Sequence, residues 1–227
     1  MNKVKPHQKS FRLSDIILGG QDGLVTILGL LLGLAAATKS ERIIVAGGLA
    51  TIFAETLSMA AVAYTSRMAD RDHYSAQRAQ EIKDIKVMTE MERQDIVDIY
   101  AAKGFKGKLL DDIVDHITAD NKLWVDTMMR EEINLLPIVK NDVYIYSLTV
   151  GLSTLAGALL PLIPFFFLGI HAAMVIALII SVFVLAGIGV YKAKMTLGKP
   201  LKSAIQMVII GMGAAIAGYL IGLAFKS

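Results

Sequence analysis

Residues 43–65 read IIVAGGLATIFAETLSMAAVAYT, and residues 67–95 read RMADRDHYSAQRAQEIKDIKVMTEMERQD. The first stretch has 23 residues, and Glu55 is its only charge. An α-helix rises about 1.5 Å per residue, so this stretch is long enough to cross a hydrocarbon core of about 30 Å. The second stretch is polar but contains neither glycine nor proline. We therefore predict a membrane-spanning helix that continues into water.

The composition also indicates an integral membrane protein. Of the 227 residues, 55% are hydrophobic and the mean hydropathy is +0.57, which is too apolar for an ordinary soluble domain. The chain has no cysteine, which excludes disulfides and thiolate metal sites. It has no P-loop, no H-E-x-x-H or G-x-S-x-G motif and no basic nucleic-acid surface. We therefore predict neither an ATP-driven motor, nor an enzyme, nor a nucleic-acid partner.

Five apolar segments are long enough to span a membrane, so the predicted fold class is an all-α integral membrane protein with five transmembrane helices. The segments are residues 16–38, 43–65, 143–167, 168–191 and 203–225. A capping-box pattern at Thr38–Glu41 predicts that the second helix starts almost at once, which makes a tight hairpin. Gly29-x-x-x-Gly33 and Gly218-x-x-x-Gly222 predict faces that allow close helix contact.

The polar region between spans two and three is predicted to be a small helical module. Thr89-x-x-Glu92 is a second capping-box pattern, which predicts a helix break near Met88. Asp120 is expected to cap the last helix of the module, and Pro137 to end it. The expected helices after the break are residues 90–103, 109–118 and 122–136. The predicted domains are residues 1–67 (tail and spans one and two), 68–139 (helical metal-binding module) and 140–227 (spans three to five).

The distribution of basic residues predicts the orientation in the membrane. Lysine and arginine cluster in the N-terminal tail, in residues 66–140 and in the linker at residues 192–202. With five spans, these three regions fall on one side, which the positive-inside rule assigns to the cytoplasm. The first apolar segment is too long for a signal peptide and lacks a cleavage site, so we expect an uncleaved span.

Two acids and a methionine form a candidate site inside the apolar spans. Asp22 and Glu55 are carboxylates where burial of charge is costly, which favours a functional role. Met59 lies one helical turn after Glu55 and therefore on the same face. Hard carboxylate oxygen combined with soft thioether sulfur suits a borderline ion such as Fe²⁺. The alternative is that the acids only form hydrogen bonds between helices and that Met59 only packs.

The module carries two further candidate sets of metal ligands. The first is Glu81, Asp84, Glu92 and Asp95, at i, i+3, i+11 and i+14. The second is Met128, Met129 and Glu132, which share a helical face. The alternative interpretation is a solvated acidic face and a methionine pair in a hydrophobic core. His116 with Asp112 and Asp115 is a third cluster, for which an exposed helix face is the preferred interpretation.

Four stretches resemble the vacuolar iron transporter family. They are DGLVTILGLLLGL at residues 22–34, ETLSMAAVAYTSRMADRDHY at 55–74, WVDTMMREE at 124–132 and PLIPFFF at 161–167. Together they extend over most of the chain in the family's order and spacing. The resemblance implies a five-span homodimeric carrier of Fe²⁺ and similar divalent ions that works as a proton antiporter.

The resemblance also implies roles for individual residues. Asp22 matches the pore aspartate of the family and Met59 its pore methionine. The cytoplasmic metal ligands of the family fall on Glu81, Asp84, Glu92, Asp95, Met128, Met129 and Glu132. Two of these are aspartates where plant members have glutamates, so their reach is shorter. The pore glutamate of plant members falls on Thr51, whereas this chain has Glu55 one turn closer to Met59.

We therefore predict a homodimeric transporter that exports Fe²⁺, or Mn²⁺, Co²⁺, Ni²⁺ or Zn²⁺, from the cytosol in exchange for protons, with no permanent cofactor. It is expected in a prokaryotic plasma membrane, or in a vacuolar membrane if the source is eukaryotic, with the N-terminus and residues 68–139 in the cytoplasm. The alternatives are a passive divalent cation channel or a metal sensor. A membrane-anchored di-iron oxidase fits less well, because the chain lacks Glu-x-x-His pairs.

Overall fold

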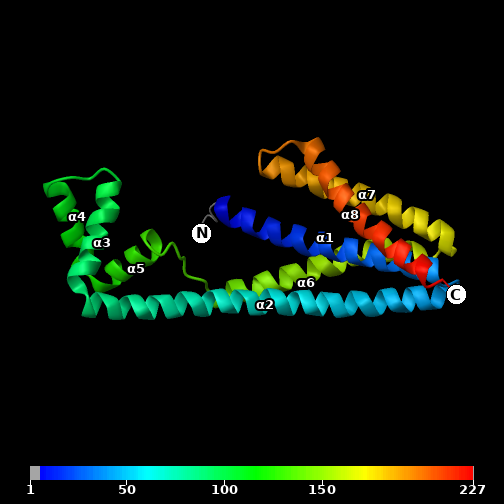
Figure 1. The fold of residues 1–227 in the computed structure, drawn as a ribbon, viewed down its shortest axis with the longest axis horizontal. Helices are drawn as coiled ribbons and strands as arrows, with labels where there is room; N and C mark the ends of the chain where they lie inside the picture. The colour runs from blue at the N-terminus through cyan, green and yellow to red at the C-terminus, as the bar shows by residue number, and fades with distance from the viewer. Residues whose placement is uncertain (1–5, 227) are drawn as a thin grey trace, which may run out of the picture. The chain divides into compact units, whose positions relative to one another are not determined.

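The computed structural model describes residues 6–226, with side chains from residue 13 onward. Over these residues the chain forms helices joined by loops and contains no strand, which confirms the predicted all-α fold (Figure 1). The elements are α1 (Pro6–Ala37), α2 (Glu41–Val87), α3 (Thr89–Ala102), α4 (Lys108–Thr118), α5 (Asn121–Glu131), α6 (Lys140–Leu162), the 3-10 helix η1 (Ile163–Phe166), α7 (Ile170–Met195) and α8 (Pro200–Ala224).

Five helical segments are long and apolar enough to cross a membrane, which confirms the predicted number of spans. They are Leu13–Ala37, α2, Lys140–Phe166, α7 and α8. The chain divides into two compact units. The first, here called the bundle, ends at Tyr64 and resumes at Tyr144; the second, here called the module, is Thr65–Val143.

Glycines bring the first and last helices of the bundle into backbone contact. A Cβ atom on Gly218 of α8 would collide with the carbonyl oxygen of Gly29 on α1, and one on Gly222 would collide with that of Gly33. The small-residue faces of the two helices therefore pack against each other within one chain, as expected for small-xxx-small patterns. A third close approach brings Gly157 of α6 against Gly20 of α1.

The core of the bundle is built from aliphatic side chains of α1, α2, α6 and α7. Leu28, Leu31, Ile44 and Leu162 are completely buried in one cluster. Side-chain hydrogen bonds also join these helices: the Ser147 hydroxyl on α6 donates to the Ala60 carbonyl on α2 at 2.6 Å. The membrane half of α2 is thereby fixed against its neighbours.

The module has a separate hydrophobic core, which Trp124, Met128 and Met129 of α5 share with residues of α2, α3 and α4. Salt bridges join its helices at the surface. Arg78 of α2 pairs with Asp126 of α5 at 3.6 Å. Arg93 of α3 pairs with Asp115 of α4 at 2.6 Å, and Lys103 pairs with Glu131.

The starts of α3 and α5 were predicted in the right place, but the predicted cap of α3 was wrong. The break near Met88 is confirmed, and Asp120 caps α5 by accepting from the backbone N–H groups of Lys122 and Leu123 at 2.8 and 3.2 Å. The Thr89–Glu92 capping box is wrong: the Thr89 hydroxyl donates to the carbonyl of Ile85 at 2.8 Å.

The first capping box also differs from the prediction. The residue that directly precedes α2 is Ser40, whose hydroxyl accepts from the Ile43 N–H at 3.4 Å. The Thr38 hydroxyl instead accepts from the Ser40 N–H at 3.2 Å and shapes the turn. Thr38, two positions before the cap residue, therefore supports the turn, and Ser40 supplies the cap.

The end of α5 corrects a predicted boundary. The helix ends at Glu131 rather than at Leu136. Asn134 adopts a left-handed conformation with φ of 57°, and the Leu135 N–H folds back to the Met129 carbonyl at 2.8 Å. Asparagine tolerates this conformation and ends helices in the same way as glycine. Glu132 therefore lies at the C-cap of α5, not on the helix.

Candidate metal centre

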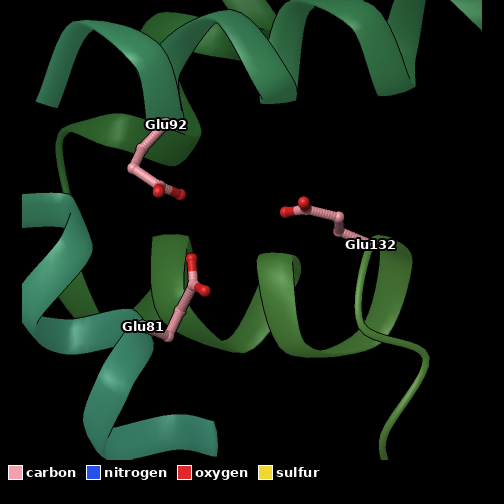
Figure 2. Close-up of side chains that lie close together, drawn as sticks. All are labelled: Glu81, Glu92 and Glu132. Atoms are coloured by element: carbon pink, nitrogen blue, oxygen red, sulfur yellow. The ribbon is translucent and has the colours of Figure 1, made fainter. Parts of the chain in front are cut away.

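Three glutamates converge in the module. Glu81 comes from α2, Glu92 from α3 and Glu132 from the C-cap of α5, and one carboxylate oxygen of each lies within 4.8 Å of the others. Figure 2 shows the three side chains pointing toward one another from three separate segments. This spacing allows one cation to contact all three carboxylates.

The local fold explains why Glu81 and Glu92 meet. On a single straight helix, residues eleven positions apart are separated by about 16 Å, too far to share an ion. The break at Met88 instead starts a new helix. Ile85 and Ile96, each one turn after a glutamate, are buried in the module core at 5% and 0% exposure. These isoleucines hold the two helices together, and the preceding turns then place the two acids next to each other.

The cluster concentrates negative charge in a poorly solvated place. Glu81 and Glu92 are only 6% and 7% exposed. Burial, followed by repulsion from Glu92, Glu132 and Asp84, raises the pKa of Glu81 to about 8. Burial also raises the pKa of Glu92. The pKa of Glu132 is raised by burial and by repulsion from Asp95 and Glu92. Without a cation, the cluster therefore holds a proton near neutral pH.

One oxygen of the cluster lacks a partner. The Oε1 atom of Glu81 is buried and forms no hydrogen bond within the described residues. A buried polar atom without a partner is costly, and a bound cation removes that cost. Three carboxylates are hard oxygen ligands that suit divalent ions. The chemistry of the donors and the unpartnered oxygen therefore both fit a metal ion.

The two aspartates of the predicted set flank this cluster. Asp84 is close enough to raise the pKa of Glu81 and of Glu92. Asp95 is close enough to raise the pKa of Glu92 and of Glu132. The Asp84 carboxylate accepts from the Gln80 amide at 2.8 and 2.9 Å. The aspartates therefore surround the three glutamates without belonging to the group of ligand atoms within 4.8 Å.

The two methionines of the predicted set lie in the module core. Met128 and Met129 are 0% and 1% exposed and pack in the same apolar cluster as Trp124. His116, Asp112 and Asp115 are exposed on the surface of α4, and Asp115 forms a salt bridge with Arg93.

The intramembrane candidates are brought together in the bundle. The Glu55 carboxyl on α2 lies within hydrogen-bonding reach of Asp22 and Thr26 on α1, and its Oε2 atom is buried without a partner in the described residues. Met59 is half-buried one turn further along α2. Thr51 differs from these residues, because its hydroxyl donates to the Gly47 carbonyl of its own helix at 2.9 Å.

One buried acid of the bundle is absent from the predicted set. Asp15 is only 5% exposed and lies inside the segment Leu13–Ala37. Asp15 lies outside the predicted first span, which begins at Ile16. A spacing of seven residues from Asp22, two helical turns on one face, is the signal that would have identified it.

The sequence is similar to one family model and to several proteins named vacuolar iron transporter. The sequence model of the VIT family matches residues 13–223. A protein named vacuolar iron transporter from Centaurea cyanus is 30% identical over 96% of this chain and 91% of its own length. Vacuolar iron transporter 1 of Arabidopsis thaliana is 30% identical over 90% of this chain and 82% of its own length. A vacuolar iron transporter of Plasmodium falciparum is 27% identical over 95% and 82%.

The match extends through both units, from the first span to the last. It therefore includes the acids of the bundle as well as the glutamate cluster of the module. On these grounds the chain belongs to the VIT family, whose named members are transporters and not enzymes.

Proposed function

We propose that this protein carries Fe²⁺, or a related divalent transition metal, across a membrane in exchange for protons. The observation that carries the proposal is the convergence of Glu81, Glu92 and Glu132 within 4.8 Å. Support comes from the five apolar helices and from relatives that are named iron transporters. Carboxylates in a poorly solvated cluster bind a divalent ion and a proton competitively, which is the elementary property that an exchanger needs.

The proposed cycle begins in the module. In the absence of metal, the shared proton offsets the repulsion between Glu81 and Glu92. A divalent ion displaces that proton, because it neutralises more charge and binds all three carboxylates at once. Met128 and Met129 are proposed as soft ligands that favour Fe²⁺ over Mg²⁺ or Ca²⁺.

The second stage takes place in the bundle. Asp22 and Glu55 are proposed to bind the ion in the membrane, with Met59 as a soft ligand and Thr51 at a neighbouring level. Protons that enter from the opposite side protonate the two carboxylates and release the metal. This role explains why two acids are retained in apolar helices, where each is costly unless it serves a pathway.

The proposed orientation and assembly follow from charge and resemblance. The basic residues predict that the N-terminus and the module face the cytoplasm, so the transport direction is export from the cytosol. A homodimer is the proposed assembly. The proposed membrane is the plasma membrane of a prokaryote, or a vacuolar membrane in a eukaryote.

The decisive experiment is uptake of Fe²⁺ into proteoliposomes under anaerobic conditions, with and without an imposed pH gradient. Lumenal pH is followed with a trapped dye, and the Asp22→Ala variant serves as the inactive control. Metal entry that is driven by the gradient, together with movement of protons in the opposite direction, is the expected result.

The other outcomes each identify an alternative. Flux that ignores the pH gradient indicates a passive channel, and tight binding without flux indicates a sensor. Oxygen consumption on addition of Fe²⁺ indicates an oxidase. Any of these three results would overturn proton-coupled transport.

A further inference from the structure

The turn between α7 and α8 concentrates positive charge. Lys192, Lys194, Lys199 and Lys202 lie within eleven residues, and the chain contains no aspartate or glutamate after Asp142. No carboxylate of α7 or α8 therefore neutralises these lysines. Three of them are exposed and Lys192 is half-buried. Because both helices are candidate membrane spans, the turn that joins them lies at a membrane boundary.

Large apolar side chains alternate with these lysines. Met195, Leu197 and Leu201 are 54%, 97% and 74% exposed. Exposed apolar residues between lysines are unfavourable in water but suit the boundary of a bilayer, where the apolar groups meet the acyl chains and the lysine stems extend to the headgroups.

The backbone at Leu197 is the most unusual feature of the turn. Leu197 has a φ of 55°, the left-handed conformation that glycine normally supplies just after a helix. The Gly198 N–H donates to the Ala193 carbonyl at 2.8 Å and closes this helix end. A glycine is thus available one position later, yet a leucine occupies the strained position. No side chain of residues 13–226 covers Leu197, which is 97% exposed, so its side chain is available to an apolar partner such as lipid.

We propose that the α7–α8 turn, residues 192–202, is a binding site for anionic phospholipids of the surrounding membrane. The four lysines bind the headgroup phosphate, and Leu197 inserts between the acyl chains. The first turn of α8 assists, because its N-cap residue Lys199 makes no side-chain cap, which leaves backbone N–H groups and the positive end of the helix dipole facing the phosphate. The site is independent of metal transport.

Native mass spectrometry of the full-length protein in detergent tests this proposal directly. The protein is mixed with dioleoylphosphatidylglycerol or, separately, with dioleoylphosphatidylcholine, and bound lipids are counted. We expect preferential binding of phosphatidylglycerol. Loss of one lysine should weaken the binding of phosphatidylglycerol about fivefold. The variant K192Q/K194Q/K199Q/K202Q, which lacks all four lysines, should therefore bind the two lipids equally. Equal binding of the two lipids by the wild-type protein would overturn the proposal.

A matched control removes the same number of charges elsewhere. Lys83, Lys86, Lys106 and Lys108 are exposed residues of the module, and K83Q/K86Q/K106Q/K108Q should keep the preference for phosphatidylglycerol. If the control loses the preference as well, net charge rather than this turn binds the lipid. Inorganic phosphate is added in a separate sample, and displacement of the lipid by millimolar phosphate would indicate a free-anion site instead.

Two double variants and one leucine variant keep the test decisive if the quadruple variant fails to fold. K192Q/K194Q and K199Q/K202Q should each reduce the preference partially. Leu197→Gly relieves the left-handed strain, so the unfolding temperature in detergent should stay equal or rise while binding of phosphatidylglycerol falls. Unchanged lipid binding by Leu197→Gly would remove the leucine from the site, and unchanged binding by both double variants would overturn the site itself.

Discussion

The carboxyl groups of Glu81 and Glu92 lie side by side although they belong to different helices, separated by the break at Met88. Each is almost completely buried, and neither can ionise without raising the energy of the other. Such a pair is unfavourable on its own and becomes favourable once a cation is shared. Metal binding and pH should therefore both change the stability of this pair of carboxyl groups.

Removing one carboxylate of the cluster should weaken metal binding. We expect Glu81→Gln to lower the affinity of the full-length protein for Mn²⁺ or Fe²⁺ by about tenfold or more, measured by competition with a fluorescent chelator. Glu90→Gln is the matched control, because Glu90 lies in the first turn of α3, two residues before Glu92, but outside the cluster. Equal affinities of both variants and the wild type would show that the cluster binds no metal.

The metal-free module should lose stability as the pH rises. The pKa of Glu81 is about 8 in the folded state and 4.5 without the fold. A raised pKa means that its stabilising contribution is complete below pH 4.5 and is lost as the pH rises from about 4.5 to about 8.

Fluorescence can follow this change, because Trp124 is the only tryptophan of the chain and lies in the module core. The unfolding temperature of the wild type should fall across this pH range, and that of Glu81→Gln should fall less. Parallel curves for the two proteins would contradict the assigned pKa.

Transport should depend on the acids of the bundle but not on Thr51. Asp22→Ala and Glu55→Ala should abolish metal uptake into proteoliposomes. Thr51→Ala should retain most of it, because the Thr51 hydroxyl donates to the Gly47 carbonyl of its own helix and a neutral hydroxyl binds a divalent ion more weakly than the two carboxylates do. Metal binding by the module should be unchanged in all three variants, which separates a transport defect from misfolding. Full uptake by either acid variant would remove the proposed pathway.

The glycine contact between α1 and α8 should be sensitive to one methyl group. In Gly218→Ala, the added Cβ collides with the Gly29 backbone, and such overpacking typically costs about 1–3 kcal/mol. Gly213→Ala on the same helix is the control, since its Cβ would enter open space and gain helix propensity of about 1 kcal/mol. Thermal unfolding in detergent should show opposite shifts. A shift in the same direction would contradict the backbone contact.

Much of the fold could be predicted because its signals are strong and local. Long apolar segments identify the five spans, and Asp120 and the break at Met88 were correctly placed. The end of α5 was not, because Pro137 was the more obvious stop signal, whereas the left-handed turn at Asn134 depends on one residue that many conformations tolerate. Asp15 was missed because the boundary of an apolar segment is gradual.

The candidate site was predicted as a set of residues but not as a geometry. The sequence placed Glu81 and Glu92 in one set of ligands, and they meet because the helix is interrupted between them. Glu132 joins them from the C-cap of α5, the position at which the helix ends. The methionine pair was predicted to share a face with Glu132, but burial in the core is a property of tertiary packing, which periodicity alone does not reveal.

The contact of Gly29 with Gly218 also constrains how the protein is made. The two residues are 189 positions apart in the chain (218 − 29), so the first span enters the membrane long before its partner has been synthesised. Its glycine face must meanwhile rest against lipid or against the insertion machinery. Assembly of the bundle therefore cannot be completed before α8 has been synthesised, and truncation ahead of α8 should leave the first span exposed to quality control.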